Sequence, residues 1–244
     1  MVLASGSPAS TARVPALVEC MTRASIRCSG RSTTVGAHVH VEVSRITAEP
    51  LRLRDGISYL AGEVRPAVER LPDSLGTSLL TDLESGVMAF ESFWASDGPL
   101  TASEDVIAAS VPEAARRAGG TVIRERHEVL VFELDAPLHG GQGVRVTQMD
   151  VEPAKLSNVE DAVAWYGDTA VPQLADASGF RAALLYADWA SGHVISETVW
   201  QDLHALATSR SAAMASEAAA AEELNGVIGA SGEYRLEFSS ARPA

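Results

Sequence analysis

Polar side chains that suit acid–base chemistry alternate with valines in a short segment near the start of the chain. One face of the expected strand is polar and the other carries valines: His38, His40, Glu42 and Ser44 oppose Val39, Val41 and Val43. A histidine beside a carboxylate suits an oriented general base, so His40 and Glu42 are candidates for removing a phenolic proton. The alternative is a pair of exposed histidines at the start of a strand. His38 and His40 also have the spacing of two metal ligands on one face, and the sequence shows no third ligand.

A repeat with an offset of 106 residues organises the rest of the chain. Its clearest part is a turn followed by a strand that ends in tryptophan: Ser85, Gly86, Glu91 and Trp94 recur as Ser191, Gly192, Glu197 and Trp200. The matches continue colinearly to Phe132 and Phe238, and upstream, where Glu49 matches Glu152, the offset is 103. A colinear series of this length indicates a tandem duplication.

Each copy is expected to contain the same six elements. In the first copy these are strands at 38–44, 75–83, 85–94 and 121–134, with helices at 57–71 and 100–118. In the second copy they are strands at 144–151, 180–189, 193–200 and 234–238, with helices at 159–177 and 202–224. Both copies follow the order β-α-β-β-α-β, which is the ferredoxin-like pattern. Gly226, Gly229 and Gly232 are expected to form a turn and not a nucleotide-binding loop, because such a loop would be followed by the start of a helix.

Composition divides the chain into a leader and the two copies. Residues 1–37 contain four arginines, one acidic residue and many serines, threonines and alanines. This composition is typical of a disordered leader, with an organelle-targeting peptide as the alternative. The two copies then span 38–134 and 143–240, and the linker at 135–142 is rich in turn-forming residues.

The overall charge and composition argue against several classes of partner. The net charge is −13, with 32 acidic and 19 basic residues, whereas binding to a nucleic-acid backbone requires a concentrated basic surface. No apolar run approaches the roughly 20 residues of a membrane-spanning helix. Both cysteines, Cys20 and Cys28, lie in the leader, so the copies have no disulfide framework and a cytoplasmic location is expected. Neither a nucleic-acid partner nor a membrane partner is expected.

The uncovered face of each expected sheet gives a reason for having two copies. A four-stranded sheet with two helices on one face leaves its other face exposed, so two such sheets pack face to face around a cavity. The chain from 38 to 240 resembles the dimeric α+β barrel superfamily, and within it the antibiotic-biosynthesis-type monooxygenase (ABM) domain. The resemblance rests on the order of the elements, on a third strand that ends in Glu-x-x-Trp, and on the alanine-rich helix that follows.

The resemblance implies an α+β fold in which two ferredoxin-like β-α-β-β-α-β repeats pack sheet to sheet as an intramolecular α+β barrel. In such proteins two chains usually build the barrel, so the expected assembly is a monomer with an internal pseudo-dimer, or a homodimer. The implied activity is that of a cofactor-independent monooxygenase acting on an aromatic or polyketide-like small molecule, because an electron-rich phenolate can itself reduce dioxygen. The alternative is a non-catalytic small-ligand-binding or stress-response barrel. In both cases the partner is a small apolar or aromatic ligand in the barrel, with no cofactor and no metal.

Three features depart from the pattern of the family. Its members commonly carry Glu-x-Trp, whereas the spacing of Glu91 and Trp94 puts the two side chains on opposite faces unless a bulge intervenes. Quinone-forming members tend to place an asparagine on this strand, where Phe90 and Ser196 stand here. Haem-degrading relatives use a histidine within the second helix, and here His204 occurs only at the start of that helix in the second copy. Haem is therefore not expected.

The candidate catalytic residues combine this resemblance with strand geometry. If the valines of the first strand face the helices, His40 and Glu42 face the barrel, and Arg145 stands in the second copy where Glu42 stands in the first. Arg145 is then the candidate for stabilising an enolate or phenolate oxygen. Trp94 and Trp200 line a flat aromatic substrate if they face the cavity, and pack in the core if they do not.

Two carboxylates on otherwise apolar strands are also unusual. Glu91 and Glu197 recur at the repeat offset between apolar neighbours. A buried carboxylate must be paired or protonated. The alternative is an edge position from which each side chain reaches water.

Overall fold

The structure, a computed structural model, describes residues 39–152, 163–188, 190–224 and 226–243. The leader expected at 1–37 lies outside the described residues, and so does the start of the helix expected at 159–177. In the parts of the chain that are described, no helix is both long enough and apolar enough to cross a membrane.

The first half of the chain forms four strands with helices between them. The elements are β1 (His40–Thr47), the 3₁₀-helix η2 (Pro50–Arg52), α1 (Leu53–Tyr59), the π-helical segment η3 (Leu60–Val64), α2 (Arg65–Val68), β2 (Ser74–Asp82), β3 (Val87–Trp94), α3 (Asp97–Arg117) and β4 (Thr121–Leu134). The second half repeats this plan with β5 (Gly143–Asp150), the π-helical segment η5 (Tyr166–Ala170), α5 (Val171–Ala175), β6 (Phe180–Asp188), β7 (His193–Trp200), α6 (Leu203–Thr208), α7 (Arg210–Leu224) and β8 (Val227–Ser239). Both halves therefore have the ferredoxin-like order of elements.

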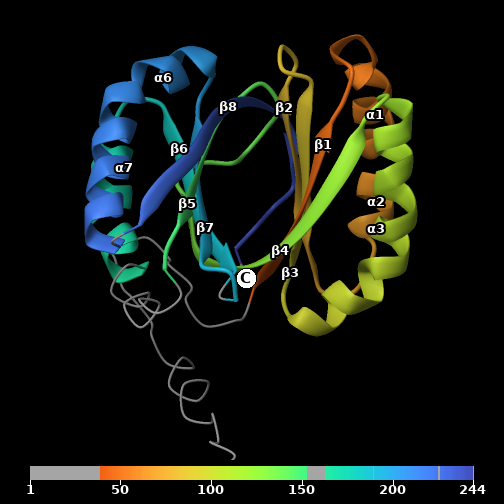
Figure 1. Cartoon of the computed structure of the whole chain (residues 1–244), viewed down its shortest axis with the longest axis horizontal. Helices are drawn as coiled ribbons and strands as arrows, with labels where there is room; N and C mark the ends of the chain where they lie inside the picture. Colours follow the sequence, from red (N-terminus) through yellow and green to blue (C-terminus); the bar gives the residue numbers. More distant parts are fainter. Residues whose placement is uncertain (1–38, 153–162, 189, 225, 244) are drawn as a thin grey trace, which may run out of the picture.

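The eight strands close into one antiparallel barrel in the order β1-β3-β2-β8-β5-β7-β6-β4. Within each half the sheet order is β4-β1-β3-β2 or its counterpart β8-β5-β7-β6, and the halves join where β2 pairs with β8 and β4 pairs with β6. Helices α1 to α3 cover the outside of one half and α6 and α7 cover the other (Figure 1). The expected intramolecular α+β barrel is confirmed. Because each edge strand is paired with the other half, closure leaves no free sheet edge.

The strand registers follow the two offsets seen in the sequence. Val43 lies opposite Glu91 across β1 and β3, and Val146 lies opposite Glu197 across β5 and β7. Equivalent positions on β1 and β5 are therefore 103 residues apart in the sequence, and those on β3 and β7 are 106 residues apart. The pairs β1–β3 and β5–β7 therefore share one register.

A wide helical turn precedes a proline in both halves. Segments η3 and η5 occupy equivalent places, and Pro66 and Pro172 follow them in the first turn of α2 and α5. Proline lacks a backbone N–H and its ring crowds the preceding turn, which a π-helical turn can accommodate. In the second half this turn begins at Tyr166, which is buried beneath it.

Side chains of the barrel wall pack in three separate cores. The barrel interior contains Val39, Val41 and Val43 of the β1 region, whereas Ile46 packs under the helices of the first half. Glu42 and Ser44 therefore face the helix layer, and the orientation expected from the sequence, with the polar set facing the barrel, is wrong. The reason is that both faces of this strand are covered, so alternation separates two faces without showing which one is inside.

The last strand is longer than the sequence indicated. Strand β8 begins at Val227, so Gly229 and Gly232 lie within it, and the expected turn at these glycines is wrong. Gly232 lies opposite Val146 of β5. A Cβ at this position would come within 2.8 Å of the Tyr234 ring, so the strand needs glycine where that ring lies against it.

Candidate functional site

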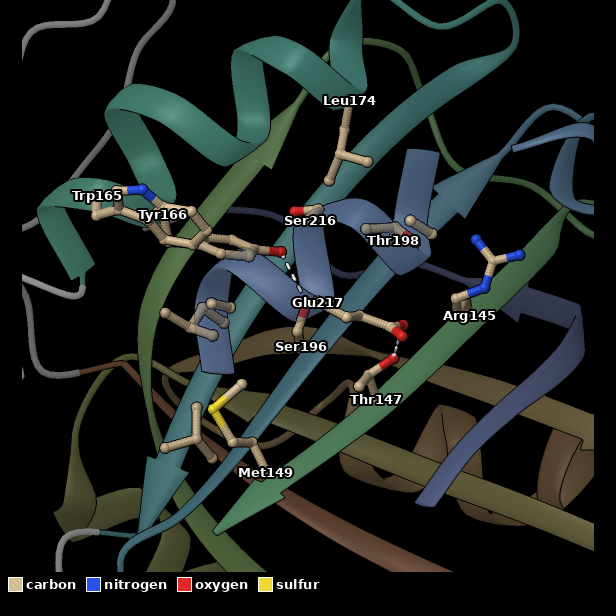
Figure 2. A pocket seen from close by; sticks show the side chains of 14 residues that line it. Arg145, Thr147, Met149, Trp165, Tyr166, Leu174, Ser196, Thr198, Ser216 and Glu217 are labelled. Atoms are coloured by element: carbon tan, nitrogen blue, oxygen red, sulfur yellow. Dashed lines mark hydrogen bonds between the residues drawn. The ribbon is translucent and has the colours of Figure 1, made fainter. Parts of the chain in front are cut away.

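A pocket of about 60 Å³ lies in the second half, between the outer face of the barrel wall and the helices that cover it. Its wall side comes from β5, β6 and β7, and its cover comes from η5, α5 and α7. Figure 2 shows Glu217 reaching across from α7 toward Thr147 of β5, with Tyr166 entering from the other covering helix. Met149 and Leu174 add apolar surface. The pocket is thus an apolar space with a few converging polar groups.

Two hydrogen bonds cross this pocket. The Thr147 hydroxyl donates to Oε1 of Glu217 at 2.7 Å, and its oxygen lies 3.1 Å from that of Ser231. The Tyr166 hydroxyl and the Ser196 hydroxyl are 2.9 Å apart (Figure 2). Burial raises the pKa of Tyr166 to about 12, so its phenol is protonated at neutral pH. The pocket therefore contains a neutral hydroxyl pair on one side and a carboxylate on the other.

Arg145 lies at one end of the pocket and is 5% exposed. Its guanidinium donates to the Ser209 hydroxyl at 3.0 Å, to the Leu206 carbonyl at 3.1 Å and to Oε1 of Glu233 at 2.8 Å. Arg210 also binds Glu233, and hydrogen bonds from Arg210 and Arg145 lower the pKa of Glu233 to about 2. Arg145 is therefore a fixed cation, held in place by the end of α6 and by β8.

The equivalent space in the first half is filled. At the repeat offset, three large apolar side chains of the first half correspond to smaller or polar ones in the second: Phe90 to Ser196, Ile107 to Ala213 and Val111 to Glu217. The three residues of the first half are at most 1% exposed and belong to its helix-side core. Phe90, Ile107 and Val111 therefore fill, in the first half, the space that stays open in the second.

The structure separates the first-half candidates from this pocket. His40 is half-buried at the start of β1, opposite Trp94 of β3. Glu42 is 1% exposed, and Arg124 donates to its Oε1 at 2.6 Å while Arg126 Nε lies 3.7 Å from its Oε2. Neither residue lines the pocket, whereas Arg145 does. Of the candidates His40, Glu42 and Arg145, the pocket therefore includes Arg145 alone.

Both candidate tryptophans are core residues under the helices. Trp94 and Trp200 are 0% exposed, in the helix-side cores of the first and second half. Each indole N–H donates to a hydroxyl two residues earlier on its strand, at 3.1 Å to Ser92 and 3.0 Å to Thr198. Phe180 meets Trp200 edge to face, with ring centroids 5.7 Å apart. The core-packing alternative therefore describes both residues.

The two strand carboxylates point the other way, into the barrel. Glu91 is 1% exposed and Glu197 is 3% exposed, so the alternative of an edge position that reaches water is wrong. The sequence spacing correctly predicted that each glutamate and its tryptophan occupy opposite faces of the strand. The Tyr186 hydroxyl of β6 donates to Oε1 of Glu197 at 2.5 Å and lies 3.4 Å from Oε1 of Glu91.

The polar residues of the pocket were not among the sequence-based candidates. Tyr166, Ser196 and Glu217 belong to expected elements but to no motif, so their individual types give no signal. A comparison of the two copies does give one, because Leu60, Phe90 and Val111 stand at the equivalent positions. At three positions that lie close together in the fold, apolar residues of the first copy are replaced by polar residues in the second. Such a set of replacements in the sequence indicates that an apolar core has been exchanged for a pocket.

The described residues contain no group of three or more histidine, cysteine, aspartate or glutamate side chains placed to hold a metal ion. His38, one of the two histidines with metal-ligand spacing, lies outside the described residues. The polar groups of the otherwise apolar pocket are hydroxyls, one carboxylate and one guanidinium, a set that suits an organic molecule with polar substituents.

Comparison with known proteins gives uncharacterised relatives and a shared fold. No family model matches the sequence. The uncharacterized protein Rv2558 of Mycobacterium tuberculosis (strain ATCC 25618 / H37Rv) is 27% identical over 208 residues, which is 85% of this chain and 87% of the relative. The uncharacterized protein Rv2557 of the same strain is 26% identical over 212 residues, or 87% of this chain and 93% of the relative.

Solved structures are similar in fold at low sequence identity. An "anthrone oxidase-like protein" has a TM-score of 0.60 at 17% identity, covering 83% of this chain and 92% of that one. A "putative monooxygenase" of Fusobacterium nucleatum subsp. nucleatum has a TM-score of 0.59 at 11% identity, covering 83% and 93%. At these identities the likeness concerns the fold alone. The chain therefore has the α+β barrel fold that is also found in monooxygenase-like proteins.

Proposed function

We propose that the pocket of the second half binds a small aromatic molecule and that the protein acts on it as a cofactor-independent monooxygenase. The reaction requires an acidic carbon or phenol that loses a proton to form an electron-rich anion. This anion reduces dioxygen, so that a CH₂ group and O₂ become a carbonyl group and water. The protein has to remove the proton, hold the anion and exclude bulk water.

Glu217 is the proposed base and Arg145 the proposed electrostatic partner. Glu217 enters the pocket from α7 and is hydrogen-bonded only to Thr147 among the contacts described at its carboxylate. Arg145 supplies a fixed positive charge at one end of the same pocket, where it would stabilise a developing oxyanion. The Tyr166 and Ser196 hydroxyls offer a donor for a substrate oxygen.

The observation that supports this proposal most strongly is the difference between the halves. One fold occurs twice in the chain, and only the second copy replaces Phe90 and Val111 by Ser196 and Glu217. A half-buried glutamate with a void beside it is less favourable than a filled apolar core. A local arrangement that opposes stability is typical of a functional site.

A second candidate function is non-catalytic binding of a smaller ligand, and the pocket volume favours it. About 60 Å³ is less than the cavity of about 150 Å³ that holds benzene. An aromatic substrate therefore enters only if lining side chains move. A candidate for this movement is Trp165, which lines the pocket and is half-buried at the start of η5. A ligand of a few heavy atoms fits without movement.

The two candidates differ in dioxygen consumption. The purified protein would be mixed in air with monocyclic phenols and with anthrone-type tricyclic compounds, and binding followed by thermal shift. The monooxygenase proposal expects one dioxygen consumed per product and one atom of ¹⁸O from ¹⁸O₂ in the product. Binding without dioxygen consumption would instead support the non-catalytic candidate.

Substitutions in α7 test the assigned base. Glu217→Gln keeps the shape of the side chain and is expected to lower turnover by about 10²-fold or more. Glu223→Gln on the same helix is the matched control, because Glu223 is exposed and does not line the pocket. Equal loss of turnover in both variants, or full activity in Glu217→Gln, would contradict the role of Glu217.

A further inference from the structure

The barrel interior contains a pair of carboxyl groups that come from equivalent positions of the two halves. Glu91 lies on β3 and Glu197 on β7, and both line the same void inside the barrel. That void has about 10 Å³ for the centre of a water molecule, which is roughly the room of one water. The rest of its lining is mostly apolar, with Phe93, Leu184 and Leu236 among its residues. The pair therefore lies in a nearly closed, poorly hydrated space.

Two ionised carboxylates are strongly disfavoured in such a space. Removal from water penalises each charge, and the two charges repel one another. Burial, together with the charge of Glu197, raises the pKa of Glu91 well above its usual range, and burial also raises the pKa of Glu197. The Tyr186 hydroxyl lies 2.5 Å from Oε1 of Glu197 and 3.4 Å from Oε1 of Glu91, so the two carboxyl groups meet at one hydroxyl. A proton on one of the carboxyls removes the repulsion between them.

We propose that Glu91 and Glu197 form a proton-binding site in the core of the barrel, in which the two carboxyls share one proton and closure of the barrel depends on it. Each half supplies one carboxyl, so the site exists only when the two halves are assembled. It lies on the opposite face of the wall from the pocket of the second half and is independent of the function proposed for that pocket.

Other titratable groups surround the site from several strands. Those that face it or its immediate neighbours are Tyr186 of β6, Tyr234 of β8, His127 and Glu125 of β4, Arg45 of β1, Asp82 of β2, His193 of β7 and Asp188 of β6. The His127 ring lies 5.4 Å from that of Tyr186, is 4% exposed, and has no hydrogen-bond partner on either nitrogen. Burial raises the pKa of both tyrosines, so they stay neutral in the neutral range.

The sign of the pH effect separates the pair from His127. Burial lowers the pKa of His127, so this residue opposes folding in acid, and its contribution no longer changes above its ordinary value of about 6.5. The raised pKa of Glu91 acts in the other direction. Its contribution is fully present below the ordinary glutamate value of 4.5 and is lost as the pH rises through the raised value. Between pH 4.5 and the raised pKa of Glu91, unfolding releases one proton.

The experiment measures unfolding in urea between pH 7 and pH 9 for the full chain and for Glu91→Gln. In the wild-type protein the unfolding equilibrium constant is expected to rise by up to about tenfold per pH unit. Glu91→Gln keeps a hydrogen-bond donor for Glu197 without a titrating proton, so this part of the pH dependence should disappear. A second measurement is the infrared carbonyl band of a protonated carboxyl above pH 7, which should be present in the wild-type protein and missing in the variant.

The control variant is Glu113→Gln, which removes the same charge from the surface. Hydrogen bonds from Arg116 and Arg117 lower the pKa of Glu113 to about 2, so it stays ionised throughout the measurement. Its pH dependence should equal that of the wild-type protein. If the unfolding equilibrium constant depends on pH equally in the wild-type protein and in Glu91→Gln, the proposal is overturned. If Glu91→Gln does not fold, absence of the protonated-carboxyl band from the wild-type protein at pH 7 to 8 overturns it.

Discussion

Arg145 and Glu233 face one another across β5 and β8, and Glu42 lies opposite Arg126 across β1 and β4. Glu42 and Arg145 occupy equivalent positions of β1 and β5, so each half has a cross-strand ion pair here, with the charges exchanged. The pair of the second half is the closer one, at 2.8 Å against 3.7 Å for Arg126 and Glu42. The exchange puts the cation on β5, which lines the pocket, and the anion on β8.

The two arginines that bind Glu233 should differ in their effect on stability. Arg145→Ala removes a buried guanidinium and leaves the Ser209 hydroxyl and the Leu206 carbonyl without its donor, so a loss of about 2 kcal/mol in unfolding free energy is expected. Arg210→Ala removes a side chain that is 63% exposed and should change stability much less, because water screens its ion pair. Urea denaturation of the two variants makes the comparison. Equal losses would show that burial of Arg145 is not what matters.

The pocket should close when it receives the side chains of the first half. Ser196→Phe alone places a large ring against Tyr166 and is expected to cost about 1–3 kcal/mol through overpacking. Tyr166→Leu together with Ser196→Phe reproduces the pair Leu60 and Phe90, so the double variant should regain most of this loss. Thermal shift with the binding ligand should show no binding to the double variant. Retained binding would place the ligand elsewhere.

Acid should weaken the second half through Glu233. Its pKa of about 2 lies below the ordinary value of 4.5, because hydrogen bonds from Arg210 and Arg145 favour its ionised form. The resulting stabilisation is present above pH 4.5 and is lost as the pH falls toward 2. Glu233→Gln should therefore lose less stability than the wild-type protein between pH 5 and pH 2. Glu223→Gln, which removes an exposed carboxylate, serves as the reference for the general effect of charge.

The tryptophans should separate core packing from ligand contact. Trp94→Phe removes a fully buried indole and its hydrogen bond to Ser92, and is expected to cost about 0.5–3 kcal/mol without changing ligand affinity. Trp165→Phe should show the opposite behaviour, because Trp165 is half-buried at the pocket. Melting temperature and ligand affinity measured side by side distinguish the two. A drop in affinity for Trp94→Phe would contradict its assignment to the core.

The chain should be a monomer in solution. All eight strands are paired on both sides within one chain, so the barrel has no edge that needs a second copy. Size-exclusion chromatography with light scattering is expected to give a mass near the chain mass of 25.6 kDa. A stable mass of twice this value would favour the homodimer alternative.

The sequence determined the plan of each half. Strands and helices have different hydrophobic periods, so their order can be found without knowing how they pack. The alternation also determined that Glu91 and Trp94 occupy opposite faces of β3, because side chains three positions apart on a strand point in opposite directions. The register shared by the halves follows from the two offsets.

Only the tertiary structure decided which face of each strand is inside the barrel. Glu42 lies on the covered outer face, where Arg124 of β4, 82 positions along the chain, donates a hydrogen bond to it. Such a partner compensates the cost of burying a charge, so polarity alone does not show on which side a residue lies. Closure of the barrel likewise brings Glu91 and Glu197 together from separate halves. The sequence contains both carboxyls and the polar residues of the pocket, but their meeting depends on long-range packing that local periodicity does not encode.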